Sequence, residues 1–479
     1  MFVHARIAVS ALLCALILPA HAAENVRWEV VKANGVKVGH VRITRNESDT
    51  GIVETEDTDI RLGKSARRVH YLLHVVTETA PDASLRRMVR EVVASEGHSR
   101  IEARAEGDDL VVTRDFGKSR DSERLAGAAR GLQTEECARE WLSAAARGKF
   151  PPPFRFRTWD PVKGTAIDVE LSIRPREGLV QVERRVTSPR GTTASYLRVA
   201  DPGWVVQETM SMGAYEFERS GATEKEALAA NGVFDHVAAL LDKSPYRIPS
   251  RDMDQKIRYR FENRGVAAIL PTGAGQRTWS EGTTTWVQVC ASCPLDAQPL
   301  SPEDRARALA PTSWLESTDE KLARRARNLT EGIPDPAKKM QRLAGFVRGY
   351  MSSQVDMLGY GTALQALHSR RGDCTEFAVL VAALGRAAGV PTRIAIGQVY
   401  ARRFEGYRHV FVPHSWVQAW TGTGWQSFDA AIGTFDSTHL AFAVSYDGDP
   451  WTHYSGISLA NQLDMKDAAR VVPRKTASN

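Results

Sequence analysis

The chain has 479 residues, of which 43% are hydrophobic and 25% are charged, a composition typical of folded globular proteins. Its net charge is only +6, because 63 basic residues are mixed with 57 acidic ones. A nucleic-acid surface would need a concentrated basic stripe, so the charge excludes nucleic acid as an expected partner. At about 100 to 200 residues per domain, the length predicts two to four domains.

Residues 1–22 have the three-part pattern of a cleaved secretory signal peptide. His4 and Arg6 precede an apolar run from Ile7 to Leu18, and an Ala-His-Ala cleavage pattern follows at residues 20–22. The apolar run is shorter than the roughly 20 residues that a helix needs to span a bilayer. We therefore expect an exported protein, periplasmic or extracellular, that is soluble after cleavage and has no stable membrane insertion.

Four cysteines follow the signal: Cys137, Cys290, Cys293 and Cys374. Cys290 and Cys293 are compatible with half a zinc site, a redox pair or a local disulfide. No second CxxC and no close His pair completes four zinc ligands, and an oxidising compartment favours disulfides. We expect one disulfide, Cys290 to Cys293, with Cys137 buried and reduced and Cys374 free.

Residues 23–230 contain many short strand-like runs separated by turn signals such as Asn34-Gly35, which predict a β-rich N-terminal domain. A helix is expected near residues 134–147, and the two halves of the region are compatible with a distant duplication. Residues 244–300 predict a smaller β segment that runs directly into Cys290.

Beyond residue 300 the apolar period changes from 2 to 3.6, which predicts that a domain over residues 301–460 begins with helices. Ser317-Thr-Asp-Glu320 has the form of a capping box before one helix. Asp335-Pro336 has the N-cap and N1 residues of the next helix.

Cys374 is expected in the first turn of a buried helix. Asp373 can cap this helix and Glu376 can be its capping-box partner, while Phe377 and Leu380 begin the buried stripe. Unpaired backbone N–H groups and the positive end of the helix dipole favour a thiolate there, and such sites lower a thiol pKa from about 8.5 to between about 3.5 and 7.5. The sequence thus predicts a nucleophile.

A hairpin is expected around the Thr-Gly-Thr-Gly sequence between Trp420 and Trp425. If these two tryptophans face each other, Asp429 opposes Trp416. His414 is then the diagonal neighbour of Asp429 on the same face, within side-chain reach.

Cys374, His414 and Asp429 can therefore converge as a catalytic triad. The thiolate would attack a carbonyl carbon, His414 would hold the proton and return it to the leaving amine, and Asp429 would fix the imidazole tautomer. His409, which is expected in the loop of residues 404–413, is a competing base that we rate below His414. Gln365 is a competing oxyanion donor, but a capping-box role explains it without chemistry, so we expect the Cys374 backbone N–H to be the donor.

Residues 372–393, the His-x-Trp of residues 414–416 and residues 425–429 closely resemble the core of bacterial transglutaminase-like proteins. The resemblance covers about residues 301–445 and is strongest over 360–430. It implies an α+β, papain-like fold in which a cysteine helix packs on an antiparallel sheet, preceded here by β-rich N-terminal domains.

By matching positions, the resemblance implies that Cys374 is the nucleophile, His414 the base and Asp429 the orienting acid. The family includes transglutaminases, cysteine peptidases and amidases. The sequence departs from many relatives, which have Pro or Thr after the aspartate where this chain has Ala430 and Ala431. This departure concerns the local turn and not the acid.

We therefore expect an exported cysteine enzyme that acts on carboxamide or peptide bonds of a protein or peptide substrate through a thioester, by hydrolysis or by acyl transfer to an amine. No cofactor and no metal are expected. The alternative is an envelope or extracellular binding or scaffold protein whose transglutaminase-like domain is catalytically silent.

Overall fold

The computed structural model describes residues 25–471, apart from 64–68, 95–96, 116–119, 162–163, 177–178, 189–190, 213–214, 264–269, 295–296, 298, 354–360, 450–451, 454–455, 457–458 and 461–462. The expected signal peptide at residues 1–22 lies outside the described residues. Within the described chain, we find no helix with the length and apolar character needed to cross a membrane.

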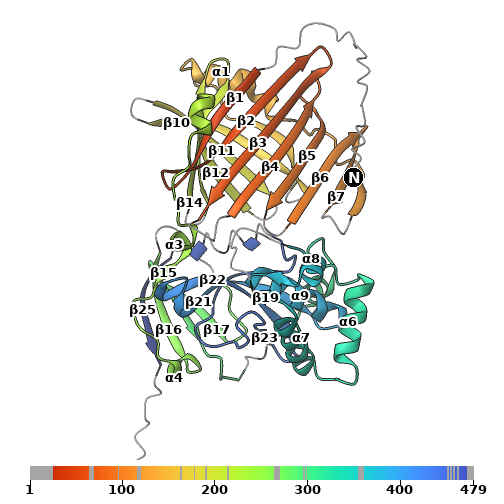
Figure 1. The fold of residues 1–479 in the computed structure, drawn as a ribbon, viewed down its shortest axis with the longest axis vertical. Coiled ribbons are helices and arrows are strands. Elements are labelled where there is room, and N and C mark those ends of the chain that lie inside the picture. The colour runs from red at the N-terminus through yellow and green to blue at the C-terminus, as the bar shows by residue number, and fades with distance from the viewer. Residues whose placement is uncertain are drawn as a thin grey trace, which may run out of the picture.

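The N-terminal region is one antiparallel sheet of 14 strands, drawn in the upper half of Figure 1. The strands are β1 (Asn25–Ala33), β2 (Val36–Ser48), β3 (Gly51–Leu62), β4 (Val69–Thr79), β5 (Leu85–Ala94), β6 (Gly97–Glu106), β7 (Asp109–Asp115), β8 (Arg120–Leu125), β9 (Phe154–Asp160), β10 (Thr165–Arg176), β11 (Leu179–Ser188), β12 (Gly191–Ala200), β13 (Trp204–Met212) and β14 (Tyr215–Ala222). Their order in the sheet is β8 to β1, then β14 to β9. The two halves of the region therefore join through the β1–β14 pair.

The long sheet folds back on itself, since β10 to β12 lie behind the face formed by β1 to β7 in Figure 1. The helix expected near residues 134–147 is a 3-10 turn, η1 (Glu135–Ala138), followed by α1 (Arg139–Ala146). Cys137 is free but only half-buried, against the apolar core beneath α1, whereas we expected full burial. Burial nevertheless raises its thiol pKa to about 12, which keeps the thiol protonated.

The C-terminal region, drawn below the first in Figure 1, is built on a five-stranded antiparallel sheet. Its order is β15-β22-β21-β24. Strand β23 also pairs with β22, at residues closer to the C-terminal end of β22 than those that pair with β15. The strands are β15 (Asp242–Lys243), β21 (Thr392–Phe404), β22 (Tyr407–Trp420), β23 (Trp425–Phe428) and β24 (Leu440–Ser445). The described helices of the chain beyond α1 are α2 (Glu224–Leu228), α3 (His236–Leu240), α4 (Ser250–Met253), α5 (Pro302–Leu309), α6 (Glu320–Thr330), α7 (Pro336–Tyr350), α8 (Ala363–Ser369) and α9 (Cys374–Ala387).

Helix α9 is the centre of this region. Its residues from Thr375 to Arg386 are all buried, and its core cluster joins α6, α7 and α8 to β21, β22 and β23. Such continuous burial needs an apolar residue on every face, which its run of Ala, Val and Leu supplies. The helix therefore has a fixed position on the sheet, and so has the cysteine at its start.

A second sheet supports the first. Its order is β17-β18-β16-β25, from β16 (Ile257–Asn263), β17 (Gln276–Glu281), β18 (Thr284–Val289) and the C-terminal strand β25 (Leu463–Arg470). Tyr259 and Phe261 of β16 make edge-on ring contacts with Phe411 and Phe442 of the five-stranded sheet. The β segment expected at residues 244–300 is thus completed by a strand from the other end of the chain. A two-stranded sheet of β19 (Ser352–Ser353) and β20 (Arg371–Gly372) precedes α9.

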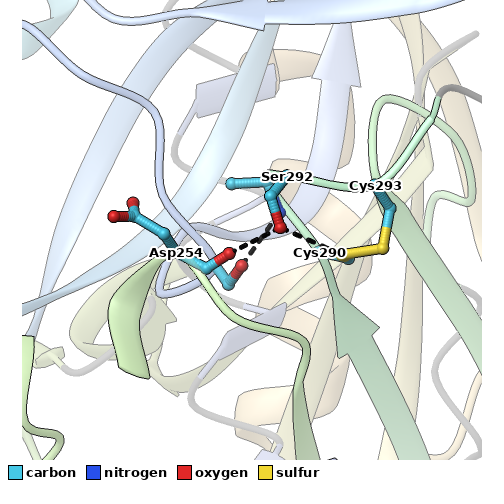
Figure 2. Close-up of a disulfide and its surroundings, with 6 residues drawn as sticks. Asp254, Cys290, Ser292 and Cys293 are labelled. Carbon is cyan, nitrogen blue, oxygen red and sulfur yellow. Dashed lines mark hydrogen bonds between the residues drawn. A yellow bond between two sulfur atoms is a disulfide. The ribbon is translucent and has the colours of Figure 1, made fainter. Parts of the chain in front are cut away.

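The expected disulfide is confirmed: Cys290 and Cys293 are bonded, and Cys137 and Cys374 are free. Figure 2 shows the four-residue turn that the bond closes, with the hydroxyl of Ser292 donating to the main-chain oxygen of Asp254 at 2.8 Å. The turn is therefore tied to the segment that precedes β16.

The expected capping box at residues 317–320 is wrong. Helix α6 begins at Glu320, and Asp319 is its N-cap, because the Asp319 carboxylate accepts the backbone N–H groups of Lys321 and Leu322 at 2.8 and 3.3 Å. A carboxylate adjacent to the helix start is the stronger acceptor for these orphan donors. The predicted start at Asp335-Pro336 is confirmed in α7.

Replacing Gly397 by Ala should destabilise the sheet. Gly397 of β21 pairs with His414, and a Cβ there would lie 1.8 Å from the main-chain oxygen of Leu440 in β24. Overpacking against backbone costs about 1 to 3 kcal/mol, so we expect urea denaturation to show a loss of this size. The matched control is Gly349→Ala in α7, where a Cβ meets nothing within 4 Å. Equal stability of the two variants would contradict the close approach.

Removing the disulfide by Cys290→Ser with Cys293→Ser should lower the free energy of unfolding by about 2 kcal/mol, because so short a loop constrains the unfolded chain little. Denaturation with and without a reductant measures this, since the reductant should affect only the wild type. Cys374 should stay open to alkylation in the variant. If peptide mapping of non-reduced protein joined Cys374 to any other cysteine, Cys374 would be structural or redox-gated.

Candidate active site

Cys374 is the first residue of α9, directly after the N-cap Asp373. The expected capping box is confirmed: the Asp373 side chain accepts the N–H of Thr375, and Oε2 of Glu376 accepts the N–H of Asp373 at 2.9 Å. The other oxygen of Glu376 accepts the N–H of Gly361 at 2.7 Å. These bonds fix the first turn of the helix, and the Cys374 side chain is half-buried there.

The Cys374 thiol lies beside β22, at the stretch of that strand between its pairing with β15 and its pairing with β23. Strand β22 pairs with β15 up to Phe411 and with β23 from Val417 onward. Ser415 lies in the interval, and its backbone N–H is near enough to the Cys374 thiol to lower the thiol pKa. The Cys374 thiol is therefore near the residue that follows His414 in β22.

The expectation of a low thiol pKa at the start of α9 is wrong. Burial raises the pKa of Cys374 well above its usual range, and the negative charges of Asp373, Glu376 and Asp429 raise it further. The Ser415 N–H lowers it, but not enough. Burial and the surrounding carboxylates outweigh the effect of the helix end, so the resting thiol is neutral. The sequence shows the helix end but not these carboxylates.

His414 and Asp429 form a buried pair. Nε2 of His414 lies 2.6 Å from Oδ2 of Asp429, and their side chains are 7% and 1% exposed. The hairpin register is as expected, since Trp420 pairs with Trp425, and β23 ends one residue before Asp429. The pKa of Asp429 is low because both neighbouring imidazoles outweigh the effect of its burial.

This pairing fixes the tautomer of His414. An ionised carboxylate only accepts hydrogen bonds, so Nε2 of His414 carries a proton and Nδ1 is left as the nitrogen that can take one. Among the contacts of the described residues, no hydrogen bond joins Cys374 to His414. The structure thus brings His414 and Asp429 together and places the Cys374 thiol near Ser415, the residue that follows His414.

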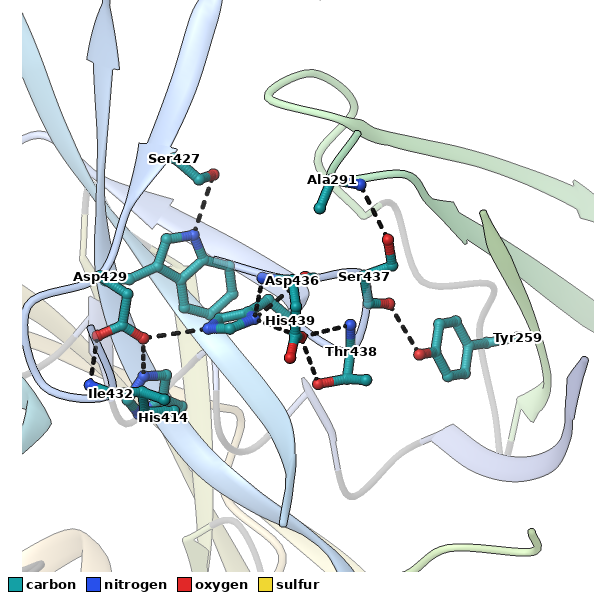
Figure 3. Close-up of polar contacts among 11 residues, drawn as sticks. Tyr259, Ala291, His414, Ser427, Asp429, Ile432, Asp436, Ser437, Thr438 and His439 are labelled. Carbon is teal, nitrogen blue, oxygen red and sulfur yellow. Dashed lines mark hydrogen bonds and ion pairs between the residues drawn. The ribbon is translucent and has the colours of Figure 1, made fainter. Parts of the chain in front are cut away.

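Two further histidines at this site were missed by the sequence analysis. Nε2 of His439 lies 3.1 Å from the same Asp429 oxygen, as Figure 3 shows. Nδ1 of His453 lies 3.1 Å from the hydroxyl of Ser415. Burial lowers the pKa of His453 to about 4, despite nearby carboxylates, so this ring is neutral. Neither residue belongs to a periodic pattern that would have marked it.

The ligand atoms of His414, Asp429 and His439 lie within 4.8 Å of one another, which is close enough for a metal site. The 2.6 Å contact between His414 and Asp429 is that of a charge-assisted hydrogen bond with a proton between the two atoms. We therefore describe the cluster as a hydrogen-bonded network.

The competing candidates have other partners. Nδ1 of His409 lies 2.6 Å from the hydroxyl of Tyr400, and His409 is five residues from His414 along β22 rather than in a loop. Gln365 has the expected capping role, because its Oε1 accepts the N–H of Thr362 at 2.8 Å. Neither residue is bonded to Asp429 among the described contacts.

A cavity of about 500 Å³ borders Asp429, between α7, β23 and the disulfide turn. Its walls include Cys290, Cys293, Arg348, Ser427 and Phe435. The acid of the pair therefore has a space beside it, and the described lining does not include Cys374.

The stability of the protein should depend on the charge of His439. Burial disfavours its imidazolium, but bonds to Asp429 and Asp436 outweigh burial and raise the pKa to about 9. A raised pKa stabilises the fold fully below the unfolded value of about 6.5, and this contribution is lost as pH rises through about 9. We expect the wild type to lose on the order of 3 kcal/mol more than His439→Gln between about pH 6 and pH 9.5 in chemical denaturation. Parallel curves for the two proteins would contradict this charge.

The chain was compared with known proteins. Residues 323–430 match the family model of the transglutaminase-like superfamily. An uncharacterised protein of Mycobacterium leprae is 33% identical over 98 residues, which cover 20% of this chain and 35% of that protein's length. The match thus spans about a third of the curated relative.

Two solved structures show distant likeness. A candidate cysteine protease of Cytophaga hutchinsonii has a TM-score of 0.29 and 16% identity, and the match covers 47% of this chain and 88% of that one. The periplasmic domain of TgpA from Pseudomonas aeruginosa has a TM-score of 0.27 and 14% identity, with 50% and 81% covered. The segment that matches the transglutaminase-like superfamily, residues 323–430, contains Cys374, His414 and Asp429.

Proposed function

We propose that the protein is an exported cysteine-dependent enzyme that acts on carboxamide or peptide bonds through a thioester. Cys374 is the nucleophile, His414 the base and Asp429 the orienting acid. The observation that carries the proposal is the buried 2.6 Å pair of His414 and Asp429 beside the helix start that bears Cys374. A buried carboxylate is costly unless it is fully hydrogen-bonded, and a buried carboxylate–imidazole pair beside a free thiol is the arrangement that catalysis by a cysteine needs.

The first half of the reaction forms the thioester. As the sulfur of Cys374 bonds to the carbonyl carbon, its proton passes to Nδ1 of His414, and the carbonyl oxygen becomes an oxyanion. The backbone N–H of Cys374, an unpaired donor at the start of α9, stabilises that oxyanion. The C–N bond then breaks, and His414 returns the proton to the leaving amine or ammonia.

The second half releases the acyl group. Water or an amine attacks the thioester carbon, His414 takes the proton of the attacking group, and the C–S bond breaks with the proton returning to Cys374. Asp429 keeps Nε2 of His414 protonated throughout, so the ring presents Nδ1 to the sulfur in both halves.

The raised thiol pKa determines when the nucleophile forms. A thiol that is neutral at rest has to lose its proton to His414 as the substrate carbonyl arrives, rather than wait as a thiolate. This fits an exported enzyme, since a neutral thiol is oxidised more slowly than a thiolate. The disulfide between Cys290 and Cys293 also supports export, because disulfides persist in oxidising compartments.

The same raised pKa favours the second candidate function, a binding or scaffold protein with a silent domain. In that case the half-buried thiol would never ionise, and the 14-stranded sheet would be the functional part. The two functions differ in whether Cys374 forms a covalent adduct with a substrate.

Turnover in triad variants tests the proposal. With dimethylated casein as the acyl donor, ammonia released without added amine reports carboxamide hydrolysis, new free amino groups report peptide-bond hydrolysis, and incorporation of a dansylated primary amine reports acyl transfer. Cys374→Ser should abolish both and leave the fold intact, since an unactivated hydroxyl is a far poorer nucleophile. His414→Ala should reduce turnover more than Asp429→Asn, for which a loss of about 10⁴-fold is expected.

His409→Ala is the matched control and should keep wild-type turnover. Loss of turnover in His409→Ala, together with full activity in His414→Ala, would move the base to His409. Retained turnover in Cys374→Ser would refute the assignment of the nucleophile. A wild type with no turnover and no acyl adduct on Cys374 would favour the scaffold.

A further inference from the structure

His439 is a fully buried histidine that the triad chemistry does not use. It is the residue before β24, and its side chain is 0% exposed. Its Nε2 shares Oδ2 of Asp429 with Nε2 of His414, at 3.1 and 2.6 Å. Figure 3 shows the carboxylate between the two rings, and the N–H of Ile432 donates to the other oxygen at 2.9 Å.

The second nitrogen of His439 also faces acceptors. Nδ1 lies 3.1 Å from both Oδ1 and the main-chain oxygen of Asp436, against one backbone donor, the Asp436 N–H, at 3.2 Å. Asp436 is itself held by the N–H and hydroxyl of Thr438 at 2.8 and 2.6 Å. A ring with a carboxylate oxygen at each nitrogen donates from both, which is the hydrogen-bonding pattern of an imidazolium.

We propose that His439 is a positioning residue of the site: a buried cation that holds the Asp429 carboxylate against His414 and offsets its charge at Cys374. The proposal rests on the proposed function, in which Cys374 is the nucleophile. An uncompensated Asp429 disfavours the thiolate, because the two negative charges repel each other. When His439 is charged, Asp429 can still orient His414, and its negative charge disfavours the Cys374 thiolate less.

The charges that face this network come from several elements. Asp429 and Asp436 face His439, and its ring also lies edge-on to that of His414 at 5.7 Å between centroids. Near the thiol are Asp373 and Glu376 of the α9 start and Asp429. His453 contacts the Ser415 hydroxyl and is close to Asp373, Asp449 and His414. Apart from His439, these groups are negative or neutral at rest, or belong to the base itself. His439 is thus the compensating cation among these described groups.

The test is the rate of Cys374 alkylation by iodoacetamide from about pH 5 to pH 11, resolved by peptide mass spectrometry so that Cys137 does not interfere. His439→Gln keeps an amide donor for Asp429 but has no charge, and His439→Leu removes both. We expect the midpoint of the rate profile to move to higher pH by about one unit in both variants, because Asp429 then acts uncompensated. His409→Gln is the matched control and should leave the midpoint unchanged.

A purely structural role for His439 would lower the melting temperature of both variants and leave the midpoint in place, and that result would overturn the proposal. Nitrogen-15 NMR of the wild type gives a readout without any variant: both His439 nitrogens should be protonated near pH 7, and a neutral ring would also overturn it. EDTA should not alter the profile, since a chelator-sensitive rate would mean a bound metal instead. Alkylation needs no turnover, so a failure here is distinguishable from a failure of the triad variants.

Discussion

The carboxylate of Asp429 is a full negative charge with 1% of its side chain exposed, and the geometry of the site depends on how that charge is accommodated. A buried charge without partners costs several kcal/mol, so it must be bonded on every side. Here the Ile432 N–H donates a hydrogen bond to one oxygen, and Nε2 of His414 and Nε2 of His439 both bond to the other. Asp429 can hold His414 in place because the Ile432 N–H and His439 fix the position of Asp429 itself.

Helix α9 supplies the other half of the site, and its start satisfies two competing demands. Asp373 and Glu376 cap the helix well, which fixes the position of Cys374, but they put negative charge beside the thiol. Capping with carboxylates stabilises the helix dipole and opposes a thiolate at the same place. Together with burial, these charges keep the well-positioned thiol neutral, so in the proposed reaction His414 has to take its proton.

Part of this site could be predicted from the sequence because it follows local rules. Residues at a tight hairpin have fixed registers, so Trp420 opposite Trp425 placed His414 near Asp429. The capping box at Asp373 followed from spacing, and the short disulfide followed from spacing together with the expected oxidising compartment and the lack of further zinc ligands. The matched family model over residues 323–430 agrees with the resemblance that these motifs suggested.

The rest depends on contacts between distant segments. His439 lies in an irregular stretch ten residues beyond Asp429, where no period marks it. The thiol pKa was misjudged because a helix end is visible in a sequence, whereas the approach of Asp429 to Cys374 is not. The pairing of β25 with β16 also joins segments some 200 residues apart, so no local pattern indicates it.

The four-stranded sheet and the disulfide turn contact the loop that contains His439. Ser437, two residues before His439, accepts the N–H of Ala291 from the disulfide turn at 2.9 Å, and its main-chain oxygen accepts the Tyr259 hydroxyl at 2.8 Å. Figure 3 shows both contacts reaching the loop that bears Asp436 and His439. The four-stranded sheet and its disulfide turn thus hold the segment that delivers a positive charge to Asp429. A region that the sequence predicts as a separate β segment thus supports, in the fold, the loop whose His439 contacts Asp429.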